Sequence, residues 1–208
     1  MKKLILIISL FCTGIIAAQS KYQIGMQKAF GLWEQGKRTQ ASQLFERISK
    51  AEPAKWKPAY YFATIEILDS FGLKDEAILN AKLTKAQEFL TVAKSNSENN
   101  PEIIITQALL NTAYIAFDGQ KYGMTLSGKN NQLYAKALAI APNNPRVILG
   151  SAEWHMGTAK FFGKPTQPYC DEVKRAIVFG KEAGIKEEFY PKFSLSRATE
   201  VLKSCQKR

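Results

Sequence analysis

Apolar residues recur every three or four positions along most of the chain, a spacing that places them on one face of a helix. The clearest stripe consists of Leu133, Ala137, Ile140 and Ala141. Pro142 follows directly, and because proline cannot continue a helix, the stripe predicts a helix that ends there. Asn144 and Pro145 then suit the N-cap and the first position of the next helix. The alternation typical of strands is nearly absent, so no β-sheet is expected.

Further helices are predicted wherever such a stripe is bounded by Gly, Pro or a capping residue. The expected helices are residues 24–35, a helix that contains Ala41 and ends at Pro53, a helix between Trp56 and Gly72, residues 75–94, 101–117 and 132–141, a helix that starts at Pro145, and residues 170–184 and 188–206. Residues 118–128 interrupt this series with a Gly-rich stretch that is longer than a turn between such helices needs. We expect a loop there, and loops of this length are either flexible or functional.

Tyr134, Ala137 and Pro142 resemble the second helix and closing turn of a tetratricopeptide (TPR) repeat. The resemblance extends over most of residues 22–184. Units of this kind are stable only when they stack on their neighbours. The resemblance therefore implies an all-α, TPR-like superhelix of four helix-turn-helix units plus a C-terminal capping helix, within one domain of residues 19–208.

In TPR proteins the first helix of each unit lines a concave groove, so the resemblance implies a non-enzymatic scaffold that binds a protein or peptide partner. The residues that it assigns to this groove are Met26, Phe30, Trp33, Glu34, Tyr60, Thr64, Ile67, Ile105, Thr112, Ser151, Trp154 and His155. Trp33 and Trp154 also fit a role as packing residues between helices. His155 is either a polar surface residue or a group that responds to pH near neutrality.

A second interpretation is a solute-binding accessory component of a transporter. The stretch Ala159-Lys-Phe-Phe-Gly-Lys is similar to a Phe-Phe-Gly turn in the TPR-like T component of TRAP transporters. A solute site would be an enclosed pocket that brings Trp154 and His155 together with residues 118–128. A peptide groove, by contrast, would be open and lined by aromatic anchors.

The N-terminus has the pattern of a secretory signal peptide: a basic pair, an apolar run over residues 4–16 and two alanines before Gln19. We expect residues 1–18 to be removed and the mature protein to be periplasmic or secreted. The apolar run is too short for a stable membrane span. Phe11 stands before Cys12 where a lipoprotein signal has a small residue, so lipidation is not expected.

Basic residues are concentrated in the second half of the chain. The net charge is +11, and residues 121–208 hold 15 basic and 7 acidic side chains, against 12 and 11 in residues 19–120. A basic region attracts anionic partners or simply aids solubility. In an exported protein an acidic protein, anionic polysaccharide or membrane headgroups fit this charge, whereas nucleic acid does not.

Cys170 and Cys205 remain after the predicted cleavage, and a pair of cysteines in an exported chain predicts a disulfide. A metal or redox site is the competing interpretation, but the chain has no CxxC motif and only one His. We therefore expect no metal and no cofactor. The sequence also lacks a recognisable catalytic constellation, so no enzymatic role is expected. A hydrolase would need Glu153 or His155 to face a second acid or a nucleophile.

Overall fold

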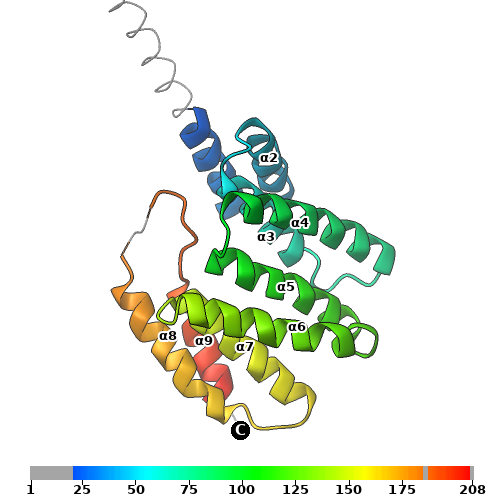
Figure 1. The fold of residues 1–208 in the computed structure, drawn as a ribbon, viewed down its shortest axis with the longest axis vertical. Helices are drawn as coiled ribbons and strands as arrows, with labels where there is room; N and C mark the ends of the chain where they lie inside the picture. The colour runs from blue at the N-terminus through cyan, green and yellow to red at the C-terminus, as the bar shows by residue number, and fades with distance from the viewer. Residues whose placement is uncertain (1–20, 185–186, 207–208) are drawn as a thin grey trace, which may run out of the picture.

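The computed structural model describes residues 21–184 and 187–206, and this part of the chain is all-α, without a strand (Figure 1). An N-terminal helix covers residues 21–34. It is followed by α2 (Arg38–Ala51), α3 (Trp56–Leu68), α4 (Glu76–Asn96), α5 (Pro101–Phe117), α6 (Gly119–Ile140), α7 (Pro145–Phe161), the short 3-10 helix η1 (Gln167–Tyr169), α8 (Cys170–Glu182) and α9 (Leu195–Gln206). The predicted signal peptide lies outside the described residues. Of the described helices, none has both the length and the apolar character needed to cross a bilayer.

Three of the described helices, α4, α5 and α7, begin at the capping residues that the sequence predicts. The Asp75 side chain accepts hydrogen bonds from the backbone N–H groups of Ala77 and Ile78 at the start of α4. Asn100 and Asn144 cap α5 and α7 in the same way, each directly before a proline. Gly72 turns the chain between α3 and α4 with a φ of 84°, a conformation that glycine adopts without steric cost.

Consecutive helices pack on one another in chain order: α3 lies against α2 and α4, α5 against α4 and α6, and α7 against α6 and α8. Apolar residues of the described chain accordingly form separate clusters along the array. The N-terminal cluster joins residues 21–34 with α2 to α5 and includes Phe45, Tyr60 and Phe62. A central cluster joins α5, α6 and α7 around Tyr134 and Trp154. These helices therefore bury their apolar faces against successive neighbours, as stacking requires.

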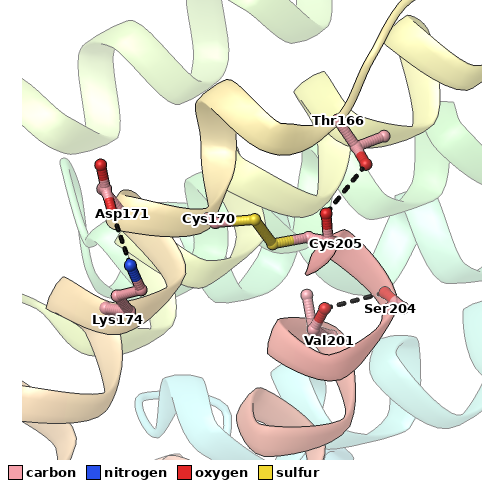
Figure 2. The surroundings of a disulfide bond; sticks show 7 residues. All are labelled: Thr166, Cys170, Asp171, Lys174, Val201, Ser204 and Cys205. Atoms are coloured by element: carbon pink, nitrogen blue, oxygen red, sulfur yellow. Dashed lines mark hydrogen bonds and ion pairs between the residues drawn. A yellow bond between two sulfur atoms is a disulfide. The ribbon is translucent and has the colours of Figure 1, made fainter. Parts of the chain in front are cut away.

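The C-terminal cluster joins α7, α8 and α9 and contains the predicted disulfide between Cys170 and Cys205. Figure 2 shows this bond between the start of α8 and the end of α9. Both cysteines are buried, and their Cα atoms are 5.8 Å apart. Thr166, in the connection before α8, donates a hydrogen bond to the carbonyl of Cys205 (3.5 Å). The disulfide prediction is thus confirmed, and the bridge closes the last helix onto the array.

The predicted loop over residues 118–128 is wrong, because residues 119–128 belong to α6. Asp118 is the N-cap, and its side chain accepts hydrogen bonds from the N–H groups of Gln120 and Lys121. The helix then runs unbroken through Gly123 and Gly128. Each glycine disfavours a helix by only about 1 kcal/mol, and the packing of α6 along α5 outweighs this.

The last helix begins at Leu195 rather than at residue 188 as predicted. The preceding residues 187–193, which we call the strap, are not helical. Pro191 has no N–H to donate and disfavours helix at the residue before it, and Phe189 has a φ of 58°. Figure 1 shows this connection between α8 and α9 extending toward the N-terminal helix.

The strap contacts the N-terminal helix, α3 and α7. The Phe189 ring packs against Tyr22 and Phe30 of the N-terminal helix, with ring centroids 6.0 and 5.7 Å apart. The Tyr61 hydroxyl of α3 donates a hydrogen bond to the carbonyl of Phe189 (2.9 Å). Arg146 of α7 donates to the carbonyl of Lys192 (2.8 Å). Residues far apart in the sequence are thereby joined, and the C-terminal region is tied to the N-terminal cluster.

Candidate functional site

A groove of about 460 Å³ lies between α4 and α6, with α5 contributing the third wall. These three helices lie side by side in Figure 1. The apolar part of the lining consists of Leu83 from α4, Leu110 from α5 and Leu126 from α6. Thr84, Gln87 and Asn111 add polar groups to the walls. The volume falls in the range of about 300–1,000 Å³ that is usual for small-molecule sites.

Two tyrosines form an aromatic pair in this groove. Tyr114 of α5 and Tyr122 of α6 have ring centroids 5.0 Å apart and ring planes inclined by 45°. Burial raises the pKa of Tyr114, and Thr84 counteracts this in part. The pair therefore offers aromatic faces for stacking together with phenol oxygens.

The rim of the groove next to Tyr122 carries a cluster of charged and polar groups. The Tyr122 hydroxyl donates a hydrogen bond to Glu76 Oε1 of α4 (2.5 Å), and Lys121 forms an ion pair with the same oxygen. Lys121 lowers the pKa of Glu76. The hydrogen bond to Glu76 raises the pKa of Tyr122, because a nearby carboxylate opposes a second negative charge. These contacts tie α6 to α4 at the mouth of the groove.

The predicted partner-binding residues do not meet in this groove, and half of them are buried in the helix packing. The buried ones are Met26, Tyr60, Ile67, Ile105, Ser151 and Trp154. Phe30 and Trp33 are partly buried and stack on each other with centroids 6.4 Å apart. Thr64 and Thr112 donate hydrogen bonds to carbonyls of their own helices, and Glu34 is exposed. Their role in binding a partner stays a prediction.

The strap covers part of the face on which the sequence predicts a partner groove. Phe30 is in contact with the strap through Phe189. Tyr60 accepts a hydrogen bond from Arg146 (3.1 Å), which in turn donates to the strap. A segment of the chain itself thus lies where a peptide was expected.

A buried ion pair between Glu102 and Arg146 lies next to the contact between Arg146 and the strap. Glu102 is completely buried, and its carboxylate accepts hydrogen bonds from Arg146 Nε (2.6 Å) and from the Asn144 side chain (2.7 Å). Burial alone would lower the pKa of Arg146, but Tyr60 and Glu102 more than offset it, so the pKa is raised. The pair links α5 and α7, and through the other hydrogen bonds of Arg146 it also reaches α3 and the strap.

The surroundings of His155 and Glu153 do not form an acid–base pair. The His155 ring stacks on Tyr169, with centroids 5.7 Å apart. Glu153 accepts a hydrogen bond from Arg197 (2.6 Å), and burial raises the pKa of its carboxyl. Trp154 donates to Asn131 of α6 (2.7 Å) and so faces the helix interface. No group of three or more His, Cys, Asp or Glu side chains suited to a metal ion occurs within residues 21–184 and 187–206.

Sequence reasoning missed Glu76, Tyr114 and Tyr122. The available signal is the tyrosine within residues 118–128, the segment that the sequence predicts to be a flexible or functional loop. On a helix, Tyr122, Thr125 and Leu126 share one face, and all three line the groove.

Comparisons with known proteins identify the fold. No family model matches the chain, and no curated protein matches it. Among solved structures, the HusA haemophore from Porphyromonas gingivalis is similar, with a TM-score of 0.77 and 22% sequence identity. The match covers 88% of this chain and 92% of that one. This likeness shows that the two proteins share an all-helical fold over nearly their whole lengths.

Proposed function

We propose that the protein is an exported, non-enzymatic carrier of a small planar ligand of the haem class, held in the groove between α4 and α6. The observation that carries this proposal is the Tyr114–Tyr122 pair in an apolar groove of about 460 Å³. Tyrosine is one of the residues that hold haem iron in proteins. The likeness in fold to a protein described as a haemophore supports the same choice of ligand.

The groove has the groups that such a ligand needs. Leu83, Leu110 and Leu126 offer apolar contact to the faces of a flat ring system. The Tyr122 hydroxyl would offer an oxygen ligand for ferric iron, and its hydrogen bond to Glu76 fixes the position of that oxygen at the rim of the groove. Tyr114 provides a second aromatic surface for stacking.

Titration of haemin, followed by visible absorption, tests this proposal. Wild-type protein should bind in a saturable manner, and Tyr122→Phe should weaken binding by about tenfold or more, the loss of roughly 1.4 kcal/mol. The same variant should lose the absorption band of a tyrosine–iron complex. Iron-free protoporphyrin should bind wild type and Tyr122→Phe alike, because only the apolar walls hold it.

His155→Ala is the matched control, because His155 is the only histidine and packs on Tyr169 outside the groove. It should leave haemin binding unchanged. If His155→Ala abolished binding while Tyr122→Phe and Tyr114→Phe had no effect, the groove would be the wrong site. If wild-type protein bound neither haemin nor protoporphyrin, the ligand class would be wrong.

Export is supported by the signal-peptide pattern over residues 1–18 and by the buried disulfide, since such bonds persist in oxidising compartments. Mass spectrometry of the protein recovered from the producing cells tests this point. The expected N-terminus is Gln19. A chain that keeps residues 1–18 and has free thiols would argue against a periplasmic or secreted location.

Binding of a protein or peptide partner is the second candidate, and the strap is the observation in its favour. The strap sequence Glu187-Glu-Phe-Tyr190 lies against the first helices as an added peptide would, with Lys57 paired to Glu187 (3.0 Å). An acidic, aromatic partner peptide would match these contacts. A labelled peptide of residues 187–193 should bind Phe189→Ala more tightly than wild type, because the weakened strap leaves its binding surface open. Adding Trp33→Ala to the Phe189→Ala variant should reduce this binding. Absence of binding to both proteins would rule this role out.

A further inference from the structure

The end of α7 exposes a pair of large aromatic side chains. Phe161 is 71% exposed and Phe162 is 64% exposed, and the two rings meet edge to face with centroids 5.1 Å apart. Burying one such side chain gains roughly 1.5–3 kcal/mol, so leaving two adjacent ones in water is costly. Contiguous exposed apolar surface of this kind marks an interaction site.

The backbone around this pair has a defined shape. Gly163 adopts a left-handed conformation (φ 64°), and Lys164 N–H donates a hydrogen bond to the carbonyl of Ala159 (2.7 Å). Such a glycine closes the C-terminal end of a helix. Phe161 also lies next to the first residue of α6, since a Cβ added to Gly119 would be 3.5 Å from its ring. The aromatic pair is therefore presented on a fixed turn.

Met124 extends the apolar surface from α6. Its side chain is 93% exposed. The Trp154 side chain of α7 bonds to Asn131 of α6, which sets the register of these neighbouring helices. Phe161 lies two turns beyond Trp154, and Met124 lies two turns before Asn131, so both reach the same end of the helix pair. We call Met124, Phe161, Phe162 and the flanking Lys160 and Lys164 the tip.

The charge at the tip is positive. Lys160 and Lys164 flank the aromatic pair, and residues 158–169 contain no acidic side chain. Neither lysine takes part in an ion pair within the described residues. Exposed aromatic residues between uncompensated cations are typical of segments that bind the interface of anionic membranes.

We propose that the tip docks the protein on an anionic lipid surface, with Phe161 and Phe162 inserted between headgroups and Lys160 and Lys164 held near lipid phosphates. A protruding apolar turn suits a soft, flat surface, and the two cations complement its charge. Tyr122 and Leu126 of the groove lie on the same N-terminal half of α6 as Met124. Docking by the tip would therefore bring the groove close to the membrane, although the docking itself does not depend on what the groove binds.

Sedimentation with vesicles tests the proposal. Protein recovered after export should bind vesicles of phosphatidylcholine and phosphatidylglycerol in equal parts, and far less to phosphatidylcholine alone. Phe161→Ser with Phe162→Ser should reduce the partition coefficient by about tenfold or more. Lys160→Glu with Lys164→Glu should reduce it by more than about 25-fold, since each cation near an anionic surface contributes about fivefold and each added carboxylate is repelled. High salt should weaken wild-type binding.

Matched controls change the same residue types elsewhere. Ile24→Ser removes another exposed apolar side chain (61% exposed) on the N-terminal helix, and Lys28→Glu with Lys203→Glu makes the same change in net charge. The apolar control should bind vesicles like wild type. The charge control should lose clearly less vesicle binding than Lys160→Glu with Lys164→Glu. The N-terminus of each preparation is determined, so that residues 4–16 cannot supply the binding, and circular dichroism checks that each variant is folded.

Three results would overturn the proposal. The first is wild-type protein that does not sediment with anionic vesicles, and the second is tip variants that bind as well as wild type. The third is an equal loss in the variants of Lys160 with Lys164 and of Lys28 with Lys203, which would indicate attraction by net charge alone. Light scattering distinguishes membrane docking from self-association of the protein. If the phenylalanine variant converted a wild-type oligomer to a monomer without any vesicle binding by either protein, the tip would contact a second copy of the chain instead.

Discussion

The two ends of the helix array are held together by different means. The N-terminal cluster is rich in large aromatic side chains, among them Phe45, Tyr60 and Phe62, and the strap adds Phe189 to its edge. The C-terminal cluster is built mainly from smaller residues such as Ala152, Val173 and Ala198. It contains the disulfide, and the N-terminal cluster does not.

This difference reflects how much apolar area each end can bury. An aromatic side chain buries about 150–250 Å², so several of them stabilise the N-terminal cluster without a covalent bond. Alanine and valine bury much less, and a small core of this kind needs further support. A disulfide supplies it by restricting the unfolded chain. The strap connects the ends, because it leaves α8 of one cluster and packs on helices of the other.

Removing Arg146 is expected to have the largest effect, because this residue joins helices from both ends. Arg146→Ala leaves Glu102 buried without its cation, which should cost about 3–5 kcal/mol in the free energy of unfolding, measured by urea denaturation. The control is Arg197→Ala, which breaks the pair with the partly buried Glu153; because Arg197 itself is 65% exposed, the loss should be clearly smaller. Equal losses in the two variants would contradict a structural role for the buried pair.

Removing the disulfide should have the next largest effect. Cys170→Ser with Cys205→Ser opens a bridge between residues 35 apart in the sequence, and the free energy of unfolding should fall by about 3 kcal/mol. Hydrogen exchange should accelerate in α8 and α9 and stay slow in α3, because the N-terminal cluster does not depend on the bridge. Uniform acceleration along the chain would show that the two ends unfold as one unit.

Phe189→Ala should weaken the opposite end. The side chain is partly buried against Tyr22 and Phe30, so its truncation should cost about 2 kcal/mol, less than for a fully buried phenylalanine. Hydrogen exchange should accelerate in residues 21–34 and leave α9 unchanged. Phe71→Ala, at a side chain that is 40% exposed, serves as the control and should cost clearly less. Unchanged stability of Phe189→Ala would mean that the strap contributes little.

Alkaline pH should also loosen the strap contact. Burial, followed by the charge of Glu188, raises the pKa of Tyr22 to about 12. A raised pKa in the folded state gives stability that is present below pH 10 and is lost between about pH 10 and 12. Because the ring is partly exposed, Tyr22 should account for only about 1 kcal/mol of this loss. Tyr22→Phe should therefore lose less stability than wild type across this range, and parallel pH profiles would refute the assignment.

The smallest expected effect concerns the helical conformation of residues 119–128. Gly128→Ala should raise the free energy of unfolding by about 0.5 kcal/mol, because alanine is the better helix former and its Cβ would meet open space. Gly123→Ala should behave in the same way. Gly72→Ala is the contrasting variant, since its φ of 84° is strained for alanine, and it should destabilise. Destabilisation by Gly128→Ala would indicate that this part of α6 is not a regular helix.

Much of the fold could be predicted because its signals are local. Asp75, Asn100 and Asn144 cap helices within three residues of themselves, and Pro142 ends one directly. The disulfide was also predictable, since only Cys170 and Cys205 remain after the expected cleavage. Such features need no knowledge of how distant segments meet.

The candidate groove could not be predicted, because its walls come from three helices whose register is set by packing. Tyr114 and Tyr122 are eight residues apart across a turn, and their approach depends on the angle between α5 and α6. Burial of Met26, Tyr60 and Ile67 likewise depends on neighbours from other helices. The resemblance to TPR repeats assigned these residues to a groove by position alone, without information on what covers them.

The amino-acid sequence by itself determined the all-α class, the positions of most helices and the cysteine pair, because apolar spacing, caps and turn residues act over a few positions. Only the tertiary structure decided that residues 119–128 are helical and that residues 187–193 form a strap. In both segments the local preference is weak, and contacts from far along the chain decide the conformation, as when Tyr61 bonds to the backbone of Phe189, 128 residues away.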